Sequence, residues 1–274
     1  MIKINYLHKA FGGGKGFKKY KMVNPFGIQS ETKDIIKYAN NNGYALPSDI
    51  NPLNDLILNL KISNIWQKLD VFYIFCGNGS NGFKLINLIN PNLHYPTALG
   101  GLTWDIDGVK GNGSNANIIT YNPSIDGVNY TLTNAGRFCV NCEFETSGAS
   151  TVIDGVIAGA NNIMGAANGT WFRINSGTTS LNSNADLSGD GFTGIFRTSN
   201  TNVHLVKLNN NFDRTQNVSA IVNNSQRILM GNSSYSRLKL SCYGMGGALT
   251  YTETQTFRTH YNNFLTSLSL TPVA

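Results

Sequence analysis

The chain has few charged residues and few cysteines, and it contains no long apolar run. Charged side chains make up 13% of its 274 residues, which is about half the usual share of a soluble domain. Asn, Ser, Thr and Gly, the residues of tight turns and exposed strand faces, take their place. Because so little charge leaves a lone molecule poorly protected against association, the composition favours a surface that packs into an assembly over a free enzyme.

No stretch of the sequence has the apolar length needed to cross a bilayer. The N-terminus also lacks the apolar run and the small-residue cleavage site of a secretory signal peptide. We therefore expect synthesis in the cytoplasm of the producing cell and no membrane partner. Nothing in the sequence predicts a specific nucleic-acid partner.

The four cysteines, Cys76, Cys139, Cys142 and Cys242, are too few for a disulfide scaffold, so we expect reduced, buried thiols. Cys139 and Cys142 form a C-x-x-C pair, but no second pair and no histidine lies in sequence reach. On a strand, a spacing of three places the two side chains on opposite faces. We predict no metal site, no redox role and no cofactor.

All of the net charge of +6 lies in the first 21 residues. Six lysines occur there without any Asp or Glu, whereas the rest of the chain carries 15 basic and 15 acidic side chains. Glycines between Phe11 and Phe17 leave the backbone unrestrained. We predict that residues 1–29 form an arm that becomes ordered on another protein, the alternative being a frayed, solvated terminus. The residues expected to anchor it are Lys3, Lys9, Phe11, Lys15, Phe17, Lys18, Lys19, Tyr20 and Lys21.

Residues 30–70 are predicted to form a helical lead-in that packs on the body. Ser30 precedes an acidic first turn, and Asn51 is the expected N-cap of a second helix near residues 50–68, with Pro52 at its first position. Apolar residues at helical spacing give this helix one buried stripe, formed by Leu53, Leu56, Ile57 and Leu60.

A last helix is predicted near residues 252–268. The run Thr252-Glu253-Thr254-Gln255 has the form of a capping box, in which the Thr hydroxyl and the Gln side chain satisfy free backbone amides. An apolar face at helical spacing follows.

Between these helices, short apolar runs alternate with clusters of Gly, Asn, Ser and Asp. So many short strands without helical crossovers indicate an antiparallel sandwich, and we assign residues 71–274 to one β-sandwich domain with its C-terminal helix. The predicted strands cover residues 71–75, 117–121, 138–144, 152–158, 171–174, 192–197, 203–208, 227–230 and 238–243.

Six segments occur in a fixed order from the second helix onward: Asn59 to Phe75, Lys84 to Pro91, Gly111 to Ser124, Asn129 to Asn134, Gly194 to Ser199 and the closing helix. Over residues 30–270 this order resembles a family of bacteriophage structural proteins with a concanavalin-like, laminin-G-like jelly-roll domain. The resemblance implies a mainly β fold, an antiparallel two-sheet jelly-roll, in a virion. Its members are tail, fibre, spike or capsid-surface components, so the implied partners are other virion proteins and further copies of the chain.

Within the third segment, Gly111, Asn112, Gly113 and Ser114 are predicted to form a structural turn. The two glycines permit the positive φ of a tight turn, and the Ser114 hydroxyl can close a side-chain turn. Because no helix follows the glycines, the motif is not a phosphate cradle.

Concanavalin-like folds include glycoside hydrolases, so acids at alternating strand positions are candidate catalytic residues. Glu143 and Glu145 alternate in this way, as do Asp105 and Asp107. Each pair, however, offers two acids where the glucanases of this fold show three in a Glu-x-Asp-x-x-Glu run. Asp105 and Asp107 also supply oxygen ligands that suit Ca²⁺, but no complete calcium loop surrounds them. We predict no catalytic residues.

Aromatic residues on sandwich loops can form a flat platform for a sugar ring beside Asn and Asp side chains. Trp104, Trp171 and Tyr235 are the candidate glycan contacts, with Tyr121 as a fourth, although aromatics in strands more often belong to the core. Our leading hypothesis is a virion protein held by its arm. A glycan-binding host-attachment module and a glycan depolymerase are the alternatives.

Overall fold

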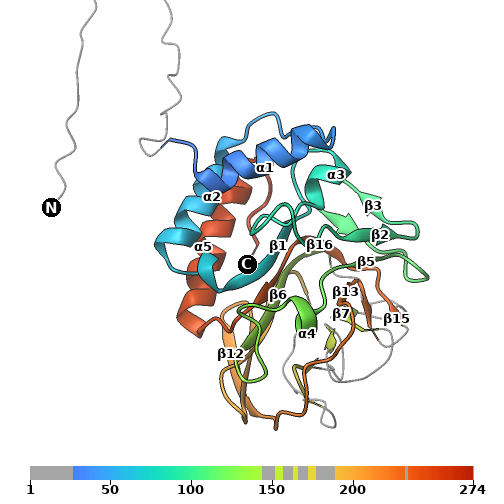
Figure 1. Cartoon of the computed structure of the whole chain (residues 1–274), viewed down its shortest axis with the longest axis vertical. Coiled ribbons are helices and arrows are strands. Elements are labelled where there is room, and N and C mark those ends of the chain that lie inside the picture. The colour runs from blue at the N-terminus through green and yellow to red at the C-terminus, as the bar shows by residue number, and fades with distance from the viewer. Residues whose placement is uncertain are drawn as a thin grey trace, which may run out of the picture.

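The computed structural model describes residues 27–143, 152–156, 163–165, 172–176, 189–231 and 234–273. In this part of the chain, three helices form one layer and two antiparallel sheets form the other two, as Figure 1 shows. The predicted fold class, a mainly β antiparallel sandwich with two N-terminal helices and one C-terminal helix, is confirmed.

The helical layer consists of α1 (Ser30–Asn41), α2 (Asn51–Ile62) and α5 (Tyr251–Ser267). A 3-10 turn, η1 (Trp66–Lys68), follows α2, and two short helices, α3 (Asn81–Lys84) and α4 (Pro123–Asp126), lie in connections between strands. None of the helices in the described ranges is both long enough and apolar enough to cross a bilayer.

The larger sheet has eight strands in the order β12-β11-β10-β6-β16-β4-β3, and β1 also pairs with β16. Their bounds are β1 Leu69–Ile74, β3 Thr103–Trp104, β4 Val109–Lys110, β6 Ala135–Glu143, β10 Gly191–Arg197, β11 Asn202–Lys207, β12 Asn210–Thr215 and β16 Lys239–Gly246.

The second sheet has six strands in the order β2-β5-β13-β7-β8-β9, and a separate hairpin joins β14 to β15. Their bounds are β2 Thr97–Leu99, β5 Asn117–Ile119, β7 Val152–Gly155, β8 Ile163–Gly165, β9 Phe172–Arg173, β13 Arg227–Ile228, β14 Met230–Gly231 and β15 Ser234–Tyr235.

Side-chain alternation along the larger sheet divides the buried residues into two cores. On β1, Phe72 and Ile74 belong to the core under the helices, whereas Val71 and Tyr73, with Phe75 just after the strand, belong to the core between the two sheets. We call these the helix-facing core and the sandwich core. Because successive strand residues point to opposite faces, one strand contributes to both.

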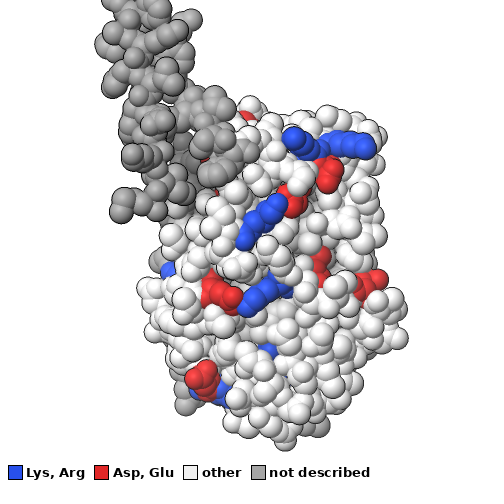
Figure 2. Space-filling view, turned by 60° about the vertical axis from the view of Figure 1, so that its left-hand side comes forward, with Lys and Arg blue, Asp and Glu red and all other residues white. Residues whose placement is uncertain are grey.

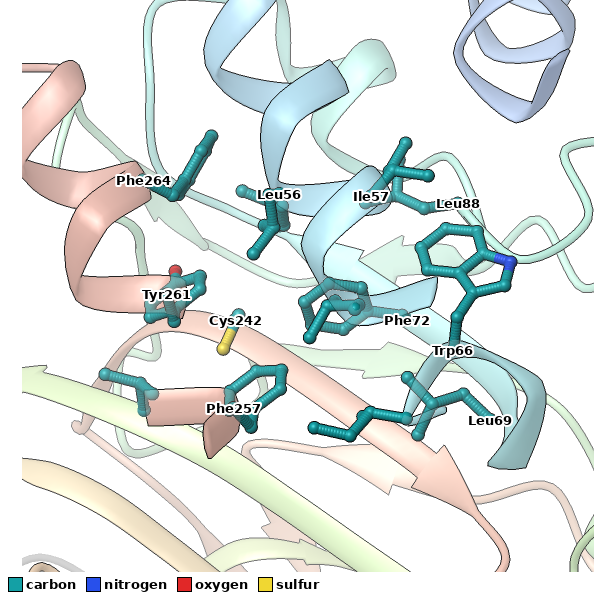
Figure 3. Packing of buried hydrophobic residues seen from close by; sticks show 14 of the residues in the cluster. Leu56, Ile57, Trp66, Leu69, Phe72, Leu88, Cys242, Phe257, Tyr261 and Phe264 are labelled. Atoms are coloured by element: carbon teal, nitrogen blue, oxygen red, sulfur yellow. The ribbon is translucent and has the colours of Figure 1, made fainter. Parts of the chain in front are cut away.

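The helix-facing core is centred on Phe257 of α5, shown in Figure 3 with its neighbours from α2, β1 and β16. The centroid of its ring lies 4.6 Å from that of Phe138, 5.7 Å from that of Phe72 and 5.7 Å from that of Tyr261. The pairs with Phe138 and Phe72 meet edge-to-face and the pair with Tyr261 is stacked, and both arrangements add to the free energy gained by burial. The apolar stripe predicted for α2 therefore packs on the body, as expected.

Several predicted boundaries were wrong. The second helix ends at Ile62 instead of near residue 68, because Asn64 takes a left-handed φ of 56° and Trp66 begins the 3-10 turn. The N-cap of this helix is Ile50, and Asn51 is the first helical residue. The N–H of Asn51 donates to Oδ1 of Asp49 at 3.1 Å. The strand predicted at 227–230 is broken because Leu229 has a φ of 64°.

The capping box of α5 lies two residues before the predicted one. Thr250 is the N-cap, and its hydroxyl accepts the N–H of Glu253 at 3.2 Å. A carboxylate oxygen of Glu253 accepts the N–H of Thr250 in return, at 2.8 Å. Thr252 and Gln255 lie inside the helix.

Candidate functional site

The described chain begins beside α2, where the predicted arm ends. The N–H of Gln29 donates to Oδ1 of Asn54 at 2.7 Å, and Nδ2 of Asn54 donates to the carbonyl of Gly27 at 3.3 Å. Asn54 is itself buried on α2. The chain thus enters the body at a fixed position on the helical layer. Residues 1–26, with all nine predicted anchoring residues, lie outside the described part.

Ion pairs within the body engage many of its charged side chains. Lys61 pairs with Glu31 at 2.7 Å and joins α2 to α1. Lys68, in η1, pairs with Glu253 of α5 at the same distance. Figure 2 shows one face of the molecule, which is largely uncharged and whose few Lys and Arg side chains lie beside Asp and Glu.

The candidate catalytic acids lie at the rim of the larger sheet. Glu143 accepts hydrogen bonds from Lys110 and Lys239, and these bonds lower its pKa below the usual range of a glutamate. Burial acts to raise the pKa of Asp105, but the hydrogen bond from Lys239, 2.7 Å long, and the backbone N–H groups of the turn outweigh burial, so the pKa of Asp105 is also lowered. The general acid of a glycosidase needs the reverse, a raised pKa. Glu145 lies outside the described residues.

Asp107 is exposed and borders a cleft of about 300 Å³ with Cys142, Asp190 and the C-terminal segment 270–273. Its N–H donates to Oδ1 of Asp105 at 2.9 Å. The two candidate acids are therefore adjacent. The Asp105 carboxylate already accepts hydrogen bonds from the N–H groups of Asp107 and Gly108 and pairs with Lys239. Within the described ranges, no three His, Cys, Asp or Glu side chains converge as a metal site requires.

The turn at residues 111–114 is closed by Asn112. Its Oδ1 accepts the N–H groups of Ser114, Asn115 and Ala116 at 2.9, 3.0 and 3.0 Å. The side chain that closes the turn is thus that of Asn112, where the sequence suggested the Ser114 hydroxyl. Gly113 has a φ of +74°, and a Cβ at Gly111 would lie 2.1 Å from the carbonyl oxygen of Ser236. These contacts give the motif a structural role.

The structure does not bring the candidate sugar-binding aromatics together. Trp104 is half-buried, and its ring meets Phe75 edge-on at 6.2 Å against the sandwich core. Tyr121 is buried and its hydroxyl donates to Oδ2 of Asp70 at 3.4 Å, so it offers no platform. Tyr235 is half-buried on the separate β14–β15 hairpin. Trp171 lies outside the described residues.

Cys139 and Cys142 lie on opposite faces of β6, as their spacing predicts. Cys139 belongs to the sandwich core, whereas Sγ of Cys142 contacts the carbonyl of Asp107 at 3.4 Å beside the cleft. Cys76 and Cys242 are buried, and burial raises the pKa of the Cys76 thiol to about 11. All four are free cysteines, and thiols with raised pKa values are poor nucleophiles.

Sequence reasoning missed a polar network between the two sheets. Arg137 of β6 pairs with Asp154 of β7 at 2.6 Å, and both side chains are fully buried. Tyr243 donates its hydroxyl to Asp154, and Arg137 also donates to the carbonyl of Arg173. Because the network is enclosed, it links the sheets and does not meet solvent. No local pattern signals it, since the partners come from four separate strands.

Sequence reasoning also missed three tyrosines that meet on the surface: Tyr38 of α1, Tyr44 of the α1–α2 connection and Tyr95 of the segment before β2. We call them the tyrosine cluster. Tyr95 is 37% exposed. Only the fold brings these residues together, so no local pattern in the sequence signals the cluster.

No family model and no curated protein matches this sequence. Among solved structures, a Trypanosoma rangeli sialidase in complex with sialic acid is similar at a TM-score of 0.48 and 8% identity, over 82% of this chain and 40% of that chain. Domain 4 of an extracellular arabinanase from Geobacillus stearothermophilus, in complex with arabinotriose, has a TM-score of 0.43 and 14% identity, over 69% and 98%. The botulinum neurotoxin serotype D binding domain has a TM-score of 0.47 and 11% identity, over 72% and 53%. Structural similarity at these TM-scores and identities does not assign an activity or a ligand to this chain.

Proposed function

We propose that this protein is a non-catalytic structural component of a bacteriophage particle, a β-sandwich that its lysine-rich N-terminal segment attaches to another particle protein. The observation that carries the proposal is the segregation of charge. The first 21 residues hold the whole net charge of +6, whereas the rest of the chain balances 15 basic against 15 acidic side chains. The class of particle is taken from the resemblance of the motif order to bacteriophage structural proteins.

Segregated charge favours attachment for an electrostatic reason. Burying an ammonium group without a partner is costly, so six lysines without acids need either solvent or an acidic surface. An acidic partner would give charge complementarity, which sets both specificity and the rate of association. Lysines of the body compete little for such an acidic partner, because lysines such as Lys61 and Lys68 already pair with acids of the body, Glu31 and Glu253.

A non-catalytic role is supported by the state of two of the four candidate acids, Glu143 and Asp105. Glu143 and Asp105 share Lys239, and their pKa values are lowered. Carboxylates held in this way stabilise the sheet rim and remain ionised at neutral pH, so they cannot donate a proton to a leaving group.

The full chain and a variant with the six N-terminal lysines changed to glutamine test the proposal. Both are mixed with particles depleted of this protein and then sedimented at increasing salt. The unchanged chain is expected to co-sediment and to dissociate as salt rises, whereas the six-glutamine variant stays in the supernatant. Lys33→Gln with Lys37→Gln, two exposed positions on α1, is the matched control and should still bind. Equal binding of all three proteins would contradict attachment through the N-terminal lysines.

Glycan binding is the second candidate function, and the tyrosine cluster favours it. Tyr38 and Tyr44 lie in the helical layer and Tyr95 precedes β2, so the cluster lies outside the N-terminal segment and can act whether or not the N-terminal lysines attach the body to a particle.

A further inference from the structure

The tyrosine cluster brings three rings from separate segments to one place on the surface. The rings of Tyr44 and Tyr95 are stacked, with centroids 5.8 Å apart and planes inclined by 17°. Tyr38 adds a third ring, 6.4 Å from Tyr95 and inclined by 35°. Tyr95 is more than one-third exposed, and Tyr38 and Tyr44 are half-buried. The cluster is therefore an aromatic surface open to solvent at Tyr95.

The rings are held in place by the body beneath them. Tyr38 and Tyr44 pack against the helix-facing core, and the N–H of Tyr44 donates to the carbonyl of Ala39 at 2.9 Å. The ring of Tyr44 lies so close to Gly82 that an added Cβ would approach it to 2.4 Å. The Tyr95 hydroxyl donates to the carbonyl of the same glycine at 3.4 Å. Rings fixed before binding lose little conformational entropy when a ligand arrives.

The three side chains of the cluster are polar but uncharged. Burial, together with the neighbouring phenols of Tyr44 and Tyr38, raises the pKa of Tyr95, and burial raises that of Tyr38. Both hydroxyls are therefore neutral at physiological pH, and that of Tyr95, whose hydrogen points to Gly82, can accept a hydrogen bond. Asn40, Asn41 and Asn42, all exposed, add amide groups at the adjoining end of α1.

We propose that the tyrosine cluster is a binding site for a neutral glycan. The apolar face of one sugar ring would lie against Tyr95, since an aromatic ring provides a large and rigid contact for the C–H groups of a sugar. The phenol hydroxyls and the amides of Asn40 to Asn42 would bind the sugar hydroxyls. A neutral, polyhydroxylated ligand fits this surface because the site provides hydrogen-bonding groups on a flat apolar base without a fixed charge.

Binding is tested with the full chain by isothermal titration calorimetry against four neutral probes: cellohexaose, laminarihexaose, maltohexaose and mannohexaose. At least one probe is expected to bind. Tyr95→Ala should weaken that binding about tenfold, whereas Tyr95→Phe keeps the ring and should lose less. Tyr251→Ala removes a half-buried tyrosine of α5 outside the cluster and should bind as the unchanged chain does. Thermal melting verifies that each variant is folded.

Three results would overturn the site. The first is that none of the four probes binds. The second is equal binding by Tyr95→Ala and the unchanged chain. The third is binding of a decaproline peptide that depends on Tyr95 when no glycan binds, because a polyproline helix also docks on tyrosine-lined surfaces. Failure of the particle-binding experiment leaves all of these measurements unaffected, since the cluster lies outside residues 1–26.

Discussion

Replacing Gly244 by alanine tests the packing between the larger sheet and α5. Gly244 of β16 is the cross-strand partner of Phe138 on β6. An added Cβ would lie 2.3, 2.7 and 2.8 Å from three atoms of the Phe138 ring, where ordinary van der Waals contact begins at 3.4 Å. The ring must therefore move by a large fraction of an atomic radius.

The surrounding rings oppose that movement. Phe257 lies 4.6 Å from Phe138 between ring centroids, and Phe192 lies 5.6 Å away in a stacked arrangement. Overpacking of a close-packed core costs about 1–3 kcal/mol, so Gly244→Ala should lower the free energy of unfolding by about that amount. Urea unfolding followed by circular dichroism measures the change.

A second substitution shows whether the collision with Phe138 is the cause. In a Phe138→Leu background, Gly244→Ala should cost at least about 1 kcal/mol less than it does alone, because the shorter side chain leaves room for the methyl group. Gly101→Ala is the control: Gly101 is exposed, and its new Cβ would approach no atom more closely than 3.2 Å, that atom being Nδ2 of Asn112, so the change should cost clearly less than Gly244→Ala. Strictly additive effects of the Gly244 and Phe138 substitutions would refute the reasoning.

Three further substitutions test the interior and the rim. Asp154→Asn leaves the buried Arg137 guanidinium without its counter-charge and should lower the free energy of unfolding by about 3–5 kcal/mol; a loss below about 1 kcal/mol in urea unfolding would show that the pair contributes little. Thr250→Ala should cost about 1 kcal/mol and Thr252→Ala much less, and thermal melts giving the reverse order would place the cap where the sequence suggested. Glu143→Gln should cost no more than about 1 kcal/mol at pH 7, because Glu143 is a surface group. Its lowered pKa means that its contribution is fully present above the ordinary glutamate pKa of about 4.3 and is lost as the pH falls through the lowered pKa of the folded state. The difference between Glu143→Gln and the unchanged chain should therefore shrink in melts at progressively lower pH, and a constant difference would contradict the assigned pairing.

Periodic local patterns predicted the helical layer well. The stripe of Leu53, Leu56, Ile57 and Leu60 is set by residues three and four apart, and all four are buried. Pro52 placed the start of α2 to within one residue. Longer strands such as β6 and β10 were also found, since both contain apolar runs.

Elements that depend on distant partners were not predictable. β12 reads Asn-Asn-Phe-Asp-Arg-Thr, a polar edge strand whose order comes from pairing with β11. Leu229 breaks the strand at 227–230 because its N–H bonds to Ile153 and its carbonyl to Ser236. The tyrosine cluster is likewise invisible in the sequence, because Tyr95 lies more than fifty residues from Tyr44.

Zero-length cross-linking in intact particles tests the proposed attachment most directly. A carbodiimide joins a lysine to a carboxylate only when the two are in contact, and mass spectrometry of the digested particles identifies the joined peptides. We predict cross-links from the lysines between Lys3 and Lys21 to Asp or Glu of a different particle protein, decreasing as salt is raised. Cross-links from these lysines only to carboxylates of the same chain, or none in particles that contain the protein, would contradict the proposal.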